Sequence, residues 1–164
     1  MTDADRRALR RLVARLVRTA GGEAVAAGPP GEVSATLAAA VRRHMLGPLA
    51  HAEGWPGFRG DHAAAAIHAD RRAAVAAEAV EALGGAGIAV MLIKGMAYAG
   101  TVYADPALRP MSDIDLMVSA TRYRDAIDVL GRLGYWHAGT PDQLSGPNHG
   151  YTLKRKDGSI DVHR

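Results

Sequence analysis

The hydrophobic pattern of the chain changes at Gly84-Gly85, and this change limits the fold more than any other feature of the sequence. Residues 9–17, 32–46 and 61–83 carry apolar side chains at helical spacing and are separated by segments rich in Gly and Pro. Beyond residue 85, apolar runs of strand length alternate with helical ones. We therefore expect an α+β protein, with a helical N-terminal region at residues 1–84 and an α/β core at residues 85–164.

The expected core contains three clear strand signals. Residues 88–93 form a continuous apolar run, which favours a strand buried on both faces. In residues 113–118, Ile, Leu and Val alternate with two Asp and a Met, as in a strand with two different faces. Asp157-Gly158 indicates a hairpin turn between residues 151–156 and 159–163. Helices are expected at 94–104 and 121–133, the start of another strand at 135–137, and a polar loop at 139–147.

Composition excludes several classes of function. The 164 residues include no Cys, so there is no disulfide scaffold, thiolate nucleophile or thiolate metal site. The longest apolar run is far too short to span a bilayer, and the N-terminus lacks the apolar core of a signal peptide. We expect a soluble, cytoplasmic protein without a membrane partner. Six arginines from Arg6 to Arg18 lack interleaved aromatic residues, so we interpret them as a solvated helix face and do not expect a nucleic-acid partner.

Asp113 and Asp115 form the strongest candidate for chemistry. On a strand, residues i and i+2 point to the same face, so the two carboxylates would lie side by side while Ile114 points into the core. Their repulsion is relieved by a cation, and carboxylate oxygens are ligands that Mg²⁺ and Mn²⁺ prefer. The pattern predicts a divalent metal site. The alternative is a pair of ordinary exposed acids.

Lys94-Gly95 is the second candidate, because it lies between an expected strand and an expected helix. Glycine permits a close backbone approach, and the first amides of a helix lack partners within that helix. Together with the Lys94 charge they would bind a phosphate group. The alternative is a simple turn from strand to helix.

Asp161 is the third candidate. Ile160 and Val162 are expected to face the core, so Asp161 and His163 share the other face. If this strand pairs beside residues 113–118, Asp161 becomes a third carboxylate, placed to take a proton from an attacking hydroxyl. His149 and His163 are themselves weaker candidates to contact a ligand or a metal, since a histidine with no spaced partner is more often simply packed or exposed.

Five motifs occur in an order that resembles a known family. They are Leu92-Ile93-Lys94-Gly95, Tyr103-Ala104-Asp105-Pro106, Arg109-Pro110, residues 113–118 and Ile160-Asp161-Val162-His163. Over about residues 86–164 the chain resembles a bacterial family classed as nucleotidyltransferases, within the superfamily of DNA polymerase β-like nucleotidyltransferases. The resemblance implies a minimal mixed sheet flanked by helices.

The resemblance also implies roles for single residues. Gly95 would hold the phosphates of a nucleoside triphosphate, with Lys94 beside it. Asp113 and Asp115 would bind Mg²⁺ or Mn²⁺, and Asp161 would be the third acid. Arg109 and Ser112 are weaker candidates for contact with the nucleotide. Lys-Gly stands where the superfamily usually has Gly-Ser or Gly-Gly, and the spacing from Gly95 to Asp113 is longer than usual.

The expected function is metal-dependent nucleotidyl transfer. An acceptor hydroxyl would attack the α-phosphate of a nucleoside triphosphate and release pyrophosphate, with two divalent ions at the site. Relatives usually continue well past the strand that carries Asp161, so we expect weaker activity from this short chain than from a longer parent. Two alternatives stay open: a weakly active or inactive nucleotide- or partner-binding module of the same fold, and a helical nucleic-acid-binding protein that uses the Arg6–Arg18 face. The acceptor, the choice of nucleotide and the oligomeric state are also open.

Overall fold

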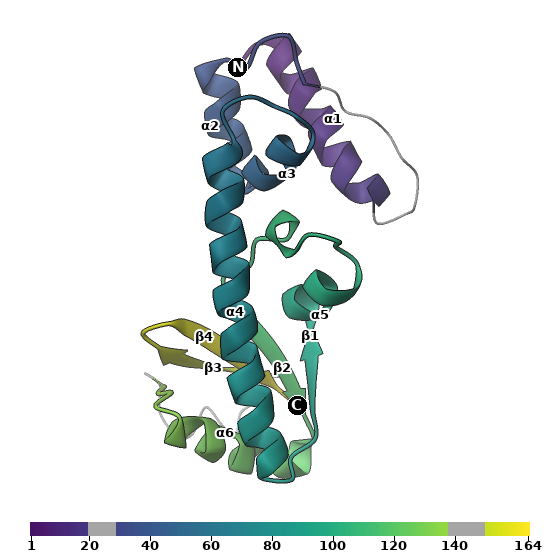
Figure 1. The fold of residues 1–164 in the computed structure, drawn as a ribbon. Helices are drawn as coiled ribbons and strands as arrows, with labels where there is room; N and C mark the ends of the chain where they lie inside the picture. Colours follow the sequence, from purple (N-terminus) through teal and green to yellow (C-terminus); the bar gives the residue numbers. More distant parts are fainter. Residues whose placement is uncertain (20–28, 138–149) are drawn as a thin grey trace. The chain divides into compact units, whose positions relative to one another are not determined.

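The computed structural model describes residues 1–19, 29–137 and 150–164 and confirms the α+β class (Figure 1). Its contacts divide the chain into two compact units. The first unit contains Met1–His68 and Asp105–Pro110, and the second contains Ala69–Ala104 and Met111–Arg164. Among the described helices, none combines the length and the apolar character needed to cross a membrane.

The first unit is helical. Its elements are α1 (Asp3–Thr19), α2 (Ala35–Arg43), α3 (Gly47–Ala52), the first part of α4 (Arg59–Gly85) and the short helix η1 (Pro106–Leu108). Its buried core consists of Ala8, Leu12, Leu37, Val41, Leu46, Leu49, Ala50, Trp55 and Phe58. The expected helix at 32–46 is shorter than predicted. Gly47-Pro48, which follows α2 in the chain, begins α3, because proline fits the first turn of a helix, where its missing N–H is not needed.

Asp105 holds the segment 105–110 within the first unit. One of its carboxylate oxygens accepts a hydrogen bond from the backbone N–H of Ala107 and caps η1. The other lies 2.6 Å from Nε2 of His62 on α4. Burial alone would raise the pKa of Asp105, but these hydrogen bonds lower it more. Asp105 therefore caps η1 and links this short helix to α4.

The second unit contains a four-stranded sheet in the order β1-β2-β4-β3. The strands are β1 (Val90–Ile93), β2 (Ile114–Val118), β3 (Gly150–Arg155) and β4 (Gly158–His163). β2 and β4 are parallel, whereas β1 pairs antiparallel with β2 and β3 pairs antiparallel with β4. The rest of α4, α5 (Lys94–Thr101), η2 (Ala120–Arg122) and α6 (Tyr123–Arg132) complete this unit.

The two faces of this sheet differ in chemistry. One face carries the apolar residues of β2, β3 and β4 and packs against α4 and α6 (Figure 1). The buried residues of this core that come from the strands are Ile114, Leu116, Val118, Tyr151, Leu153, Ile160 and Val162. Because side chains alternate along a strand, the residues between them lie on the opposite face. Asp115, Asp161 and His163 belong to that second face.

Three details of the sheet differ from the sequence predictions. β1 is an edge strand and not one buried on both faces, and Met91 is 55% exposed. The two central residues of the β3–β4 turn are Lys156 and Asp157, one position before the predicted pair. At 135–137 only an isolated bridge between Trp136 and Lys154 forms. The loop predicted at 139–147 lies outside the described residues.

Candidate functional site

The candidate site is built on the pairing of β2 with β4. In this parallel register Asp115 lies opposite Asp161, and Met117 lies opposite His163. The sequence analysis made Asp161 a third carboxylate only if its strand pairs with residues 113–118, and this pairing is present. It brings together two acids from distant parts of the sequence, on the face of the sheet that α4 and α6 do not cover.

Asp115, Asp161 and His163 form a compact group of potential metal ligands. One donor atom from each can be chosen so that all lie within 4.8 Å of one another. Two ligands of one Mg²⁺ ion, each at about 2.1 Å, are at most about 4.2 Å apart. The three side chains would therefore have to move toward one another to bind one ion. Two carboxylates and an imidazole suit Mn²⁺ well and Mg²⁺ in part.

Asp161 supplies an independent observation that favours a cation. Its Oδ1 is fully buried and has no hydrogen-bond partner among the described residues. An unpaired polar atom costs free energy when it is removed from water, and more so when it carries charge. A bound cation would satisfy this oxygen. The residues present therefore fit a divalent ion, which Asp115, Asp161 and His163 would hold.

Lys94 reaches the same group from the end of β1. Ile93 pairs with Asp115, so Lys94 follows directly beside the start of β2. Its ammonium lies 2.5 Å from Oδ1 of Asp115 and 3.3 Å from Nε2 of His163. Its φ of 50° places Lys94 in the left-handed region, which is uncommon for a residue other than glycine. The predicted junction of strand and helix at Lys94-Gly95 is present, on the side of the sheet where β2 begins.

Asp115 is the electrostatic centre of the group. Its side chain is only 7% exposed, and its Oδ1 is close both to Lys94 and, at 2.8 Å, to Nε2 of His163. Burial alone would raise the pKa of Asp115, but the hydrogen bonds from Lys94 and His163 outweigh burial and lower it. Lys94 in turn has a raised pKa, first because of its hydrogen bond to Asp115. Asp115 therefore stays ionised.

Gly95 has a tighter environment than an open phosphate loop would need. A Cβ placed on Gly95 would lie 3.4 Å from Cβ and 3.5 Å from Sδ of Met111. A methyl group just fits there, and a larger side chain would push on the segment that leads to Asp113. The first turn of α5 has no side-chain cap at Ile93, so side chains leave its amides available.

Asp113 and Ser112 lie just before β2. The first paired residue of β2 is Ile114, so strand alternation does not fix Asp113 as it was predicted to. Asp113 belongs to no described group of three or more metal-binding side chains. Its Oδ1 accepts a hydrogen bond from Oγ of Ser112 at 3.3 Å, and its charge acts on Lys94. Asp113 is thus near the ammonium but outside the compact group.

Arg109 is the remaining predicted site residue. It belongs to the first unit, and its guanidinium donates a hydrogen bond to the carbonyl oxygen of Pro110. His149 lies outside the described residues. His163 was underestimated by the sequence analysis, although its two-residue spacing from Asp161 already placed both on one face of the strand.

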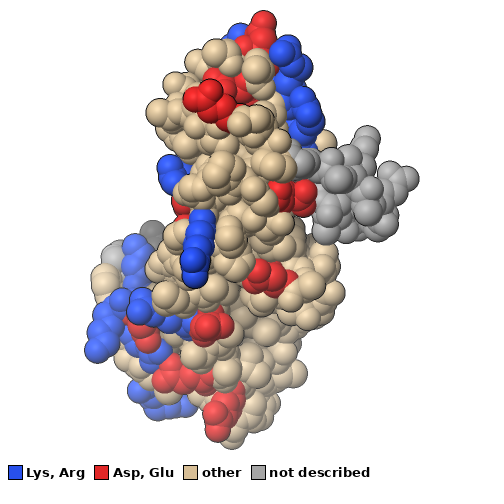
Figure 2. Space-filling model, turned by 45° about the horizontal axis from the view of Figure 1, so that its top comes forward, with Lys and Arg blue, Asp and Glu red and all other residues tan. Residues whose placement is uncertain are grey.

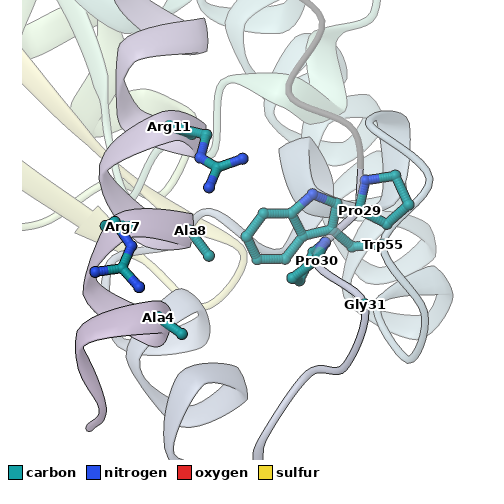
Figure 3. A pocket seen from close by; sticks show the side chains of 8 residues that line it. All are labelled: Ala4, Arg7, Ala8, Arg11, Pro29, Pro30, Gly31 and Trp55. Atoms are coloured by element: carbon teal, nitrogen blue, oxygen red, sulfur yellow. The ribbon is translucent and has the colours of Figure 1, made fainter.

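The first unit contains a separate cavity of about 290 Å³ (Figure 3). Its lining includes Arg7 and Arg11 from α1 and Trp55, together with small and proline residues, but no acid and none of the predicted site residues. On the face shown in Figure 2, basic and acidic side chains are interspersed.

Comparison with known proteins assigns the chain to a family. A family model described as an uncharacterised nucleotidyltransferase matches residues 30–164. The chain belongs to this family. No curated protein and no solved structure matches it. Membership of this nucleotidyltransferase family agrees with the resemblance found in the sequence motifs, and the matched residues include both β2 and β4.

Proposed function

We propose that this member of the nucleotidyltransferase family transfers a nucleoside monophosphate from a nucleoside triphosphate to an acceptor hydroxyl in a metal-dependent reaction. The observation that carries the proposal is the pairing of Asp115 with Asp161 across β2 and β4, with His163 on the same face. A metal site with these ligands suits a reaction in which negative charge gathers on phosphate oxygens.

The metal would be held by Asp115, Asp161 and His163, and Asp113 would join them on the side of the triphosphate. Mg²⁺ or Mn²⁺ fits the donor set, and the buried unpaired oxygen of Asp161 supports this choice. When bound, the ion neutralises charge on the phosphates and on the attacking oxygen. Asp115 contributes an ionised carboxylate because its pKa is lowered.

The triphosphate would bind at the junction of β1 and α5. The first amides of α5 and the ammonium of Lys94 both favour an anion there. Gly95 allows the backbone to approach the phosphates, and Ser112 could donate a hydrogen bond from the adjacent segment. Arg109 stays a prediction for a further phosphate contact.

Asp161 would act as the proton acceptor. The acceptor oxygen forms a bond to the α-phosphorus, and the bond from that phosphorus to the oxygen shared with the β-phosphate breaks. The bonding pair leaves with pyrophosphate, and the proton of the acceptor hydroxyl passes to the carboxylate of Asp161. The class of acceptor, whether a sugar, a small molecule, a protein or an RNA end, is left to experiment.

The direct test is release of pyrophosphate. The full chain is incubated with each common nucleoside triphosphate, Mg²⁺ or Mn²⁺, and a panel of hydroxyl acceptors. We expect release that depends on metal and is lost in Asp115→Asn and Asp161→Asn. Asp128→Asn, an exposed acid on α6, is the matched control and should keep the activity. Nucleotide binding without pyrophosphate release in any combination would contradict the proposal and favour a binding module of the same fold.

A further inference from the structure

The candidate site already contains a cation of its own. The ammonium of Lys94, Oδ1 of Asp115 and Nε2 of His163 form a triangle with sides of 2.5, 2.8 and 3.3 Å. The chain has only three lysines among its 20 basic residues, the others being Lys154 and Lys156 on the β3–β4 hairpin. An ammonium is more compact than a guanidinium and acts as a point charge, as a small cation does.

The backbone holds this lysine in an unusual way. Lys94 is one of two described residues other than glycine with a positive φ, at 50°. Such a conformation is strained for a residue other than glycine and persists where the surroundings fix it. The Lys94 side chain is largely exposed, and its described side-chain contacts are the ion pair with the buried carboxylate of Asp115 and the contact with Nε2 of His163.

Lys94 and a metal ion would draw on the same donor atoms. Oδ1 of Asp115 is in hydrogen-bonding contact with both Lys94 and His163, whereas Oδ1 of Asp161 accepts no hydrogen bond from any residue that the structure describes. The Nε2 of His163 can donate an N–H to Asp115, or it can offer a lone pair to the Lys94 ammonium or to a metal, but it can do only one of these at a time. A divalent ion on these ligands would also repel an ammonium a few ångströms away.

We propose that Lys94 is the resident cation of this group and that a divalent ion displaces it from Asp115 and His163. The displaced ammonium is then free to pair with the triphosphate that arrives with the ion. Lys94 therefore opposes binding of the metal alone and favours binding of the metal together with nucleotide. This inference rests on the proposed function for the existence of the metal site, and it adds a competition that the proposed function does not require.

If Lys94 competes with the metal, its removal should raise the Mn²⁺ affinity, whereas a simple supporting role for Lys94 predicts no such increase. Replacing Lys94 by Met removes the competing cation, so Mn²⁺ without nucleotide should bind about tenfold more tightly. Removing a lysine that merely organises the carboxylates would instead weaken Mn²⁺ binding or leave it unchanged. In the presence of chelator, Lys94→Met should melt at a lower temperature than the parent, because the buried Asp115 then loses its ion pair with Lys94. Mn²⁺ should restore more of that stability than it adds to the parent.

The experiment measures Mn²⁺ binding by electron paramagnetic resonance and by calorimetry on the full chain, with no nucleotide present. Lys156→Met, in the exposed β3–β4 turn, removes the same charge elsewhere and should change the Mn²⁺ affinity less than twofold. Lys94→Arg keeps a positive charge and should bind Mn²⁺ no more tightly than the parent. Circular dichroism checks that each variant folds.

The outcomes separate the two ideas. Tighter Mn²⁺ binding in Lys94→Met but not in Lys156→Met supports the displacement. Equal or weaker binding in a folded Lys94→Met variant overturns the displacement and leaves the metal site of the proposed function intact. Should neither the parent nor Lys94→Met bind Mn²⁺, the displacement and the metal site would both be refuted.

Discussion

Asp115 and Asp161 lie directly opposite each other on parallel strands, although they are distant in the sequence. Both point away from the apolar core, and within the described part of the chain only Asp115 pairs with a basic side chain. This difference in pairing indicates different roles for the two acids. Asp115 anchors cations, whereas Asp161 keeps an oxygen without a partner.

Asn substitutions should separate these two roles. We expect Asp161→Asn to lower the rate of pyrophosphate release at least about 100-fold while nucleotide still binds, because a proton acceptor is lost. Asp115→Asn should lose both Mn²⁺ binding and turnover. Initial rates and calorimetric titration with nucleotide distinguish the two variants. Turnover at the parent rate in Asp161→Asn would refute its role as proton acceptor.

His163 should contribute to metal affinity. His163→Gln keeps a polar side chain but loses the imidazole nitrogen, so we expect Mn²⁺ affinity to fall about tenfold with the fold preserved. Titration with Mn²⁺ gives the affinity, and thermal unfolding checks the fold. His68→Gln, an exposed histidine on α4, is the control. Unchanged affinity in His163→Gln would reduce His163 to a hydrogen-bond partner of Asp115.

Gly95 offers a test of the phosphate turn through two graded changes. Gly95→Ala places a methyl group at ordinary contact distance from Met111 and should leave the melting temperature nearly unchanged. Gly95→Val adds bulk against Met111 and should destabilise the protein by about 1–3 kcal/mol. If the backbone at Gly95 approaches phosphate, Gly95→Ala should nevertheless weaken nucleotide binding. Parent-like nucleotide affinity in Gly95→Ala would exclude such an approach.

Arg155 should make stability depend on pH in the acid range. Its side chain, 17% exposed, pairs with Glu78 on α4 and with Asp157, and it lies over the ring of Tyr135. Hydrogen bonding to Arg155 is the main reason that the pKa values of both carboxyl groups are lowered. Lowered pKa values stabilise the fold above the ordinary values of 4.5 and 3.8, and this contribution is lost as the pH falls through the folded-state values.

The corresponding measurement compares Arg155→Met with the parent across pH. At pH 7 we expect Arg155→Met to be less stable by about 1–3 kcal/mol, after allowing for the partial exposure of both acids. The difference should shrink as the pH falls below about 4. Denaturant unfolding at several pH values gives the free energies. A difference that is constant from pH 7 to pH 3 would contradict this origin.

The sequence predicted which face of each strand the candidate residues occupy, but not how the strands pair. Alternation in 113–118 and 159–163 correctly placed the apolar residues toward the core and Asp115, Asp161 and His163 away from it. Alternation is a local property, so it could not show by itself that these two strands pair. Alternation made Asp161 a third carboxylate only if the strands pair, the family resemblance implied the same acid, and the structure supplied the register.

Other features could not be predicted because long-range contacts decide them. An apolar run such as 88–93 fits an edge strand or a central one, and only the partners of β1 settle which. The left-handed backbone of Lys94 is a rare conformation that no local preference favours. Its contact with Asp115, which joins the end of β1 to β2, could not be predicted from the Lys-Gly motif.

The parallel pairing of β2 with β4 has a consequence for how the protein folds. The β3–β4 hairpin has a two-residue turn and forms from local contacts, whereas β4 can join β2 only after a long connection that includes α6 has closed. The hairpin alone carries Asp161 and His163 but lacks Asp115. In refolding experiments Mn²⁺ binding should therefore lag behind the recovery of helical circular dichroism, and the metal would report the completed chain topology.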